Sequence, residues 1–123
     1  MIIGLNHTGF VVSNLEESAK FYQDVIGLDL ADSFERQGPK MSQVIGYPNA
    51  HLKINMFDLG SNHMLELIEY VYPEPYQRPT EHRSVIGGSH IAFTVENIYE
   101  TWSDLKLKGV KPLNPPVEVV DGK

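Results

Sequence analysis

His7-Thr-Gly-Phe-Val-Val-Ser-Asn-Leu-Glu-Glu17 occurs again near the other end of the chain, as His90-Ile-Ala-Phe-Thr-Val-Glu-Asn-Ile-Tyr-Glu100. The two copies keep a constant offset of 83 positions, and five of the eleven aligned residues are identical. Unrelated segments of this length match at about one position, so we interpret the pair as a duplicated structural unit. Both copies begin with a histidine, and duplication can bring two such side chains to one site.

The composition of the 123-residue chain fits one compact domain, or two small halves that share a core. Hydrophobic residues make up 41% and charged residues 21%, which is ordinary for a soluble globular protein. The net charge of −6 argues against nucleic acid or an anionic membrane surface as a partner. Neither a leader pattern nor a long apolar run is present, so we expect a cytoplasmic protein. Because there is no cysteine, only histidine and carboxylate side chains remain as strong metal ligands.

The first part of the chain has the pattern of a β-α-β-β-β unit. A helix is expected between Asn14, a typical N-cap residue, and Gly27, a typical C-cap residue. Residues 41–47 are compatible with either a helix or a strand. The expected strands cover residues 2–12, 28–34, 52–59 and 63–72.

The second copy starts to repeat this order after an exposed connector at residues 73–88, which is rich in proline and charged residues. We expect a strand at 89–95, a helix at 98–108 and the start of another strand at 110–113. No counterpart of the 52–72 hairpin precedes Lys123. Because an unfinished sheet leaves an open edge, we expect the natural protein to continue past this residue.

The two repeated histidines are the first candidates for a functional site. Phe10 and Val12 share the face of their strand that suits helix packing, so His7 is expected on the opposite, concave face. His90 has the same relation to the apolar residues of its own strand. A single strand histidine is more often a hydrogen-bonded core residue than a ligand, but the repeat favours a shared metal site.

Glu66 is the third candidate, because it lies inside the apolar segment Met64-Leu-Glu-Leu-Ile68. Burial of a carboxylate costs free energy unless the group is paired or binds a cation. Glu69 is the alternative carboxylate on the same strand. Two neutral imidazoles and one carboxylate form a ligand set that suits Zn, Ni, Fe, Co or Mn.

The duplicated unit, the opening Leu5-Asn-His7-Thr-Gly-Phe-Val-Val and the helix end Phe21-Tyr-Gln-Asp-Val-Ile-Gly27-Leu resemble the vicinal oxygen chelate superfamily. That group includes glyoxalase I, methylmalonyl-CoA epimerase, extradiol dioxygenases and fosfomycin- and bleomycin-resistance proteins. The resemblance implies an α+β fold in which two tandem βαβββ units form one concave mixed sheet. Residues 1–123 would then be a single glyoxalase-like domain, composed of a first unit at 1–72, the connector at 73–88 and a second unit at 89–123 that is incomplete.

The resemblance also implies a divalent metal ion, one of Zn, Ni, Co, Mn or Fe, held by His7, Glu66 and His90. A fourth ligand, a glutamate on the last strand of the family's fold, would lie past Lys123. In this family the ion chelates two neighbouring substrate oxygens, and a nearby carboxylate moves a proton on the adjacent carbon. Glu66 is the candidate catalytic base. Units of this family pair within a chain or across a dimer, so a homodimer is expected.

These observations predict a metal-dependent isomerase or lyase of the glyoxalase and epimerase type that acts on a small oxygenated metabolite. Glyoxalase I carries a glutathione-binding arginine four residues after the first histidine, whereas this chain has Val11 there, which argues against glutathione as substrate. An extradiol-type dioxygenase that uses Fe(II) or Mn(II) is one alternative. A non-catalytic small-molecule-binding protein of the bleomycin-resistance type is another.

Overall fold

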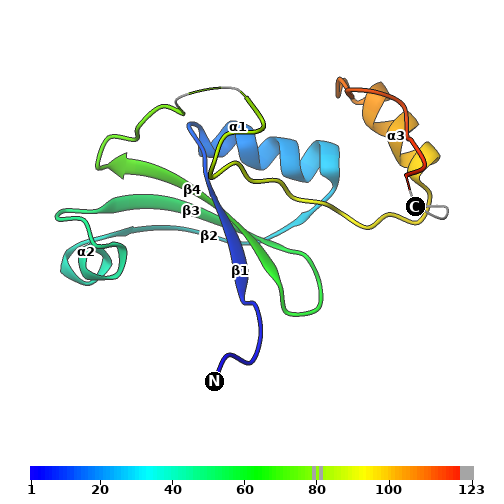
Figure 1. Cartoon of the computed structure of the whole chain (residues 1–123). Coiled ribbons are helices and arrows are strands. Elements are labelled where there is room, and N and C mark those ends of the chain that lie inside the picture. Colours follow the sequence, from blue (N-terminus) through cyan, green and yellow to red (C-terminus); the bar gives the residue numbers. More distant parts are fainter. Residues whose placement is uncertain (79, 81, 120–123) are drawn as a thin grey trace. The chain divides into compact units, whose positions relative to one another are not determined.

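The structure is a computed structural model that describes residues 1–78, 80 and 82–119 (Figure 1). It divides into two compact units, Met1–Gln77 and Arg78–Lys123, and each is described by itself. The expectation that both units belong to one domain stays a prediction.

The first unit is a four-stranded mixed sheet with helices, as the α+β prediction requires. The strand order is β1-β4-β3-β2, with β1 parallel to β4 and the other neighbours antiparallel. In chain order the elements are β1 (His7–Val11), α1 (Leu15–Lys20), the π-helical segment η1 (Phe21–Ile26) that continues α1, β2 (Asp29–Gln37), α2 (Pro39–Ile45), β3 (His51–Asp58) and β4 (Met64–Tyr72).

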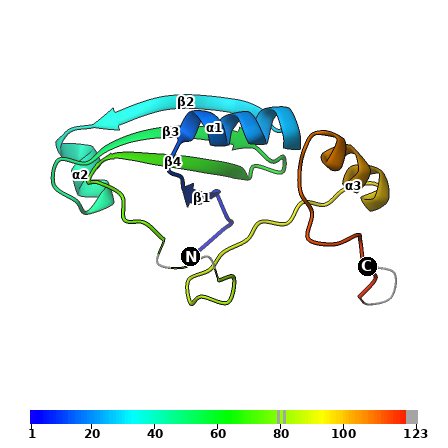
Figure 2. The same ribbon diagram turned by 90° about the horizontal axis from the view of Figure 1, so that it is seen from above.

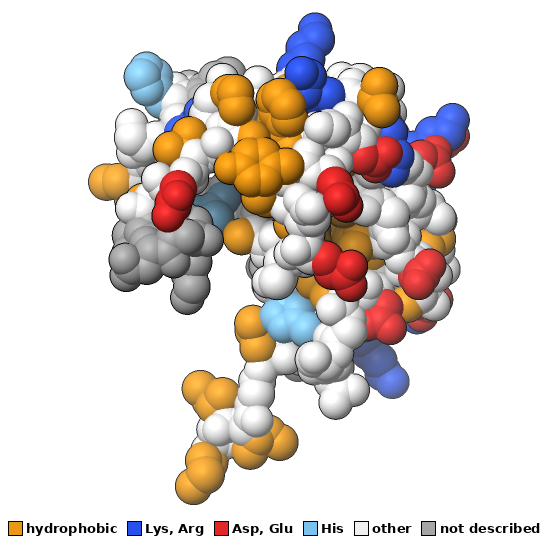
Figure 3. All heavy atoms as spheres, turned by 90° about the vertical axis from the view of Figure 1, so that its right-hand side faces the viewer, with side chains coloured by type: hydrophobic (Ala, Val, Ile, Leu, Met, Phe, Trp, Pro, Cys, Tyr) orange, Lys and Arg blue, Asp and Glu red, His pale blue; other side chains and the backbone are white. Residues whose placement is uncertain are grey.

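The predicted βαβββ order of the first unit is therefore confirmed, with two adjustments. The first strand is shorter than expected and begins at His7, because residues 1–6 have no regular secondary structure. The apolar side chains of Met1, Ile2 and Ile3 on this segment are exposed. The N-terminal trace extends away from β1 in Figure 1, and hydrophobic side chains cover the projection at the bottom of Figure 3. The ambiguous residues 41–47 are mostly helical, because Pro39 occupies the first turn of α2, where a missing N–H costs nothing.

The repeated asparagines are helix caps. The Asn14 side chain accepts a hydrogen bond from the Glu17 N–H at 3.0 Å, at the start of α1. In the second unit, the Asn97 side chain accepts from the Tyr99 N–H at 3.1 Å and the Glu100 N–H at 3.2 Å. Each interaction satisfies backbone donors that have no partner within the first helical turn. The duplication therefore preserves a local folding signal as well as a histidine.

The core has parts on both faces of the sheet, because Leu52 and Ile54 of β3 are buried on the face that points away from α1. The other part lies between α1 and the opposite face, here called the helix face (Figures 1 and 2). Phe57, Leu65 and Leu67 are completely buried there, beneath Leu15 and Ala19 of α1. The Tyr22 ring lies 6.0 Å from the ring of Phe57, measured between centroids. Because side chains alternate along a strand, the intervening residues of β4 point to the opposite face of the sheet.

The second unit contains α3 (Ile98–Leu107), as predicted. The expected strands at residues 89–95 and 110–113 are wrong for this structure, which has no regular secondary structure at these positions. A strand requires hydrogen-bonded neighbours, and the described part of this unit has no other strand to supply them. Over the placed residues of both units, no helix combines the length and apolar character needed to span a membrane.

Candidate functional site

His7 and Glu66 lie on the face of the sheet that points away from α1, here called the site face. In the parallel pairing of β1 with β4, His7 is opposite Met64 and Gly9 is opposite Glu66. Glu69 has the opposite orientation, because its Oε2 accepts a hydrogen bond of 2.6 Å from the Leu15 N–H of α1. Of the two carboxylates that the sequence left in competition, only Glu66 therefore shares a face with His7.

The His7 imidazole and the Glu66 carboxylate point toward one another. His7 Nε2 lies 3.5 Å from Glu66 Oε2, and the two side chains are 44% and 16% exposed. The other ring nitrogen, Nδ1, lies 2.7 Å from Asn6 Oδ1. An amide oxygen only accepts hydrogen bonds, so this contact requires a proton on Nδ1. When the imidazole is neutral, the lone pair of Nε2 therefore points toward the carboxylate. A cation placed between the two groups would be bound by both Nε2 and Oε2.

Gly9 provides the room in which the Glu66 carboxylate lies. A Cβ atom built at position 9 would be 3.0 Å from Glu66 Oε2 and 3.6 Å from Ile68 Cδ1. Any side chain larger than hydrogen would therefore displace the carboxylate from its place beside His7. The Glu66 carboxylate therefore uses the space that the absence of a side chain at position 9 leaves.

Tyr70 extends the site face beyond Glu66, and sequence reasoning did not single it out. Burial raises the pKa of the Tyr70 hydroxyl above its ordinary value, with smaller contributions from the nearby charges of Tyr47 and Glu66. The shift extends to higher pH the range in which the phenol is protonated and can donate a hydrogen bond. The available signal was strand periodicity, since residues 66, 68 and 70 share a face.

His90, the third predicted ligand, lies in the second unit. Its side chain is exposed, and the residues around it have no regular secondary structure. Within the placed residues, no group of three or more histidine, cysteine, aspartate or glutamate side chains is arranged to hold a metal ion. The structure thus brings together two of the three predicted ligands, His7 and Glu66, and the convergence of His90 on them stays a prediction.

Two other histidines of the first unit have local partners. His63 Nε2 lies 3.1 Å from Thr8 Oγ1, and His51 pairs with the Glu35 carboxylate on the neighbouring strand. Thr8 is adjacent to His7 in β1 and so points to the helix face. Neither histidine therefore adds a ligand to the His7–Glu66 pair.

Comparisons with known proteins agree with this architecture. The family model described as Glyoxalase/Bleomycin resistance protein/Dioxygenase superfamily matches residues 4–123. The curated 2-epi-5-epi-valiolone epimerase from Actinomyces sp is 29% identical over 124 residues, which cover 98% of this chain and 67% of that protein. The mitochondrial methylmalonyl-CoA epimerase from Mus musculus is 25% identical over 115 residues, which cover 94% of this chain and 58% of that protein. The chain thus spans between 58% and 67% of the length of these two relatives.

Solved structures show the same fold. A glyoxalase family protein from Bacillus cereus matches with a TM-score of 0.83 at 23% identity, covering 97% of this chain and 80% of that chain. A mutant of the fosfomycin resistance protein FosX from Listeria monocytogenes, complexed with Mn(II) and 1S,2S-dihydroxypropylphosphonic acid, matches with a TM-score of 0.53 at 23% identity. That match covers 95% of this chain and 79% of the FosX chain.

Proposed function

Because the chain belongs to the glyoxalase/bleomycin resistance protein/dioxygenase superfamily, we propose that it is a metal-dependent isomerase of the epimerase type. Its substrate would be a small oxygenated metabolite bound over the site face. The observation that carries the proposal is the 3.5 Å approach of His7 Nε2 to Glu66 Oε2, on the face that points away from α1. The names of the two curated relatives, both epimerases, support this reaction type over the dioxygenase and the non-catalytic binding protein.

His7, Glu66 and His90 are the proposed ligands of one divalent ion. Zn, Ni, Co, Mn and Fe all accept two imidazoles and a carboxylate, so the ligand set does not choose among them. When bound, the ion supplies Lewis-acid stabilisation to two neighbouring oxygens of the substrate. We further propose that the units pair in a homodimer and that the protein is cytoplasmic.

Three residues of the chain would orient the metal ligand, move the proton and bind the substrate. Asn6 holds the His7 ring in one orientation through the 2.7 Å contact with Nδ1. The Glu66 carboxylate is the candidate base, because epimerisation removes a proton from a carbon centre and returns it on the other side. The Tyr70 hydroxyl, whose raised pKa keeps it protonated, is a candidate donor to an oxygen of the substrate.

Titration with Co(II), followed by its visible absorption bands, tests the ligand assignment without knowledge of the substrate. The proposal predicts that His7→Ala, Glu66→Gln and His90→Ala each weaken Co(II) binding about tenfold or more, because each removes a direct ligand. The matched controls are His82→Asn and Glu74→Gln, which change exposed residues outside the His7–Glu66 pair. Unchanged affinity in the His7 and Glu66 variants would overturn the proposed site.

A further inference from the structure

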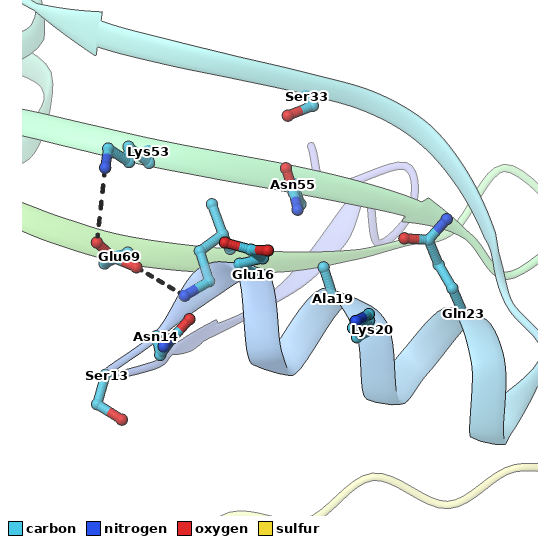
Figure 4. A pocket seen from close by; sticks show the side chains of 11 residues that line it. Ser13, Asn14, Glu16, Ala19, Lys20, Gln23, Ser33, Lys53, Asn55 and Glu69 are labelled. Atoms are coloured by element: carbon cyan, nitrogen blue, oxygen red, sulfur yellow. Dashed lines mark hydrogen bonds and ion pairs between the residues drawn. The ribbon is translucent and has the colours of Figure 1, made fainter.

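The site face carries a cationic side chain in addition to the proposed metal ligands. The strands of the described sheet contain two lysine or arginine residues, Lys53 and Arg36. Lys53 points to the helix face, where its Nζ lies 3.9 Å from Glu69 Oε1 (Figure 4). The pairing of β2 with β3 places Arg36 opposite Leu52, the residue before Lys53. Because side chains alternate along a strand, Arg36 points to the site face.

The strand register connects Arg36 with Glu66 through an apolar surface. Glu66 is opposite Met56 on β3, and Ile68, two residues further along β4, is separated from Phe34 of β2 by a single residue of β3. The side chains of Met56, Ile68 and Phe34 are half-buried, so part of each is open to solvent. Neighbouring strands lie about 4.8 Å apart and residues rise about 3.4 Å along each strand, which places the Phe34 backbone about 12 Å from that of Glu66.

The guanidinium group of Arg36 is held over the Phe34 ring. Its Cζ atom lies 4.3 Å from the ring centroid, and Nη1 donates a hydrogen bond of 3.1 Å to the backbone oxygen of Glu35. Phe34 precedes Arg36 by two residues, on the side nearer to Glu66, so the guanidinium bends toward the proposed metal ligands. A guanidinium stacked on an aromatic ring can still donate hydrogen bonds in its own plane.

Arg36 has no carboxylate partner within the described residues, although β2 is acidic. The adjacent Glu35 pairs with His51 instead, and Asp32 Oδ1 accepts a hydrogen bond of 2.8 Å from the Ser33 N–H. The whole chain contains 16 acidic residues and 10 basic ones, so acidic partners are abundant. A guanidinium forms its strongest hydrogen bonds with carboxylate and phosphate oxygens, often two in parallel. Its unused donors on an apolar surface therefore favour an anion that comes from outside the chain.

We propose that Arg36 binds an anionic group, a carboxylate or a phosphate, at the end of the substrate remote from the His7–Glu66 pair. The substrate is then an oxygenated organic acid or phosphate ester, and an apolar segment over Ile68 and Phe34 separates its two polar ends. Assignment of this anion to the substrate rests on the proposed function, whereas anion binding by Arg36 does not.

Anion binding is tested in the metal-free chain with hexanoate and hexyl phosphate, two anions that have an apolar tail. The chain contains three arginines, so NMR can follow the Nε–H signals of Arg36, Arg78 and Arg83 together. We expect a saturable shift of the Arg36 signal, at anion concentrations that leave the other two signals in place. The uncharged control, 1-hexanol, should cause no comparable shift. The anion that binds more tightly identifies the group as a carboxylate or a phosphate.

Assignment of the anion to the substrate is tested in the Co(II)-loaded chain with suberic acid monohydroxamate. Its hydroxamate group binds metal ions through two neighbouring oxygens, and its carboxylate lies at the far end. Octanohydroxamate has a methyl group in place of that carboxylate. We expect the carboxylated probe to bind about tenfold more tightly, and this ratio to fall to about one in Arg36→Met. Lys53→Met, which removes the same charge from the helix face, should keep the wild-type ratio.

Two results would overturn anion binding by Arg36: no saturable shift with either anion in the metal-free chain, or equal shifts of all three arginine signals. Equal affinities of the two hydroxamates in the wild-type chain, or a preference that persists in Arg36→Met, would overturn the assignment of the anion to the substrate. If neither hydroxamate binds, the proposed metal site fails and the substrate assignment fails with it. The metal-free titration still decides whether Arg36 binds an anion, so the two proposals are tested separately.

Discussion

Gly9 lies directly opposite Glu66 in the parallel pairing of β1 with β4, and a Cβ atom at position 9 would be 3.0 Å from Glu66 Oε2. This relationship joins the first strand of the unit to its last, across 57 positions of sequence. Glycine is otherwise unfavourable in a strand. It occurs here because the Glu66 side chain approaches the backbone closely at position 9.

Gly9→Ala should therefore weaken metal binding while the fold persists. The added methyl group displaces the Glu66 carboxylate by a few tenths of an ångström, and we expect a Co(II) affinity about tenfold lower. The measurement is Co(II) titration together with thermal unfolding. Gly4→Ala is the matched control, since a Cβ atom at position 4 meets nothing within 4 Å. Equal affinity in the Gly9 and Gly4 variants would contradict the prediction.

Asn6→Ala should lower metal affinity through His7. The asparagine accepts a hydrogen bond from His7 Nδ1 at 2.7 Å, and loss of such an orienting partner typically costs about 10–100-fold in affinity. Asn6→Asp should retain the affinity for Co(II), because a carboxylate oxygen also accepts a hydrogen bond from the Nδ1–H group of His7. If the alanine and aspartate variants bind Co(II) equally well, Asn6 has no positioning role.

Asn14→Ala should destabilise the first unit without affecting the metal. Loss of an N-cap side chain costs about 1 kcal/mol, here through the 3.0 Å hydrogen bond from the Glu17 N–H. Chemical denaturation with urea measures the change in the free energy of unfolding. Asn14→Ser, which retains a capping oxygen, should lose much less, and equal losses in both variants would count against the assigned cap.

The pH dependence of stability should carry a contribution from Tyr70. Its pKa in the folded chain is raised above the ordinary value of 10.0, chiefly by burial. The protonated phenol is therefore favoured by folding, so this contribution is complete below pH 10.0 and is lost as pH rises through the raised pKa. Above that pH, the free energy of unfolding of Tyr70→Phe, measured by urea denaturation, should decrease less with rising pH than that of the wild-type chain. An unchanged pH profile would contradict a raised pKa for Tyr70.

The positions of His7 and Glu66 on one face of the sheet were partly predictable, because side chains alternate along a strand. Strand periodicity places His7 opposite the Phe10 face, and the same rule separates Glu66 from Glu69 once the helix side is known. The cap at Asn14 was also predictable, since capping depends on residues within one helical turn.

The remaining features depend on contacts between distant segments. The closeness of Gly9 to Glu66 follows from the β1–β4 register, which no local pattern specifies. For the same reason, the alternation of apolar residues at 89–95 was insufficient to predict a strand, because a strand also needs a neighbour.

The number of imidazoles bound to the metal tests directly whether His7 and His90 hold one ion. Pulsed electron paramagnetic resonance of the Mn(II)-loaded protein detects each coordinated histidine nitrogen. We expect signals from two imidazoles in the wild-type chain and in His82→Asn. One signal should remain in His7→Ala, and one in His90→Ala. No imidazole signal, or a signal that persists unchanged in His7→Ala, would contradict a metal site built on His7 and Glu66.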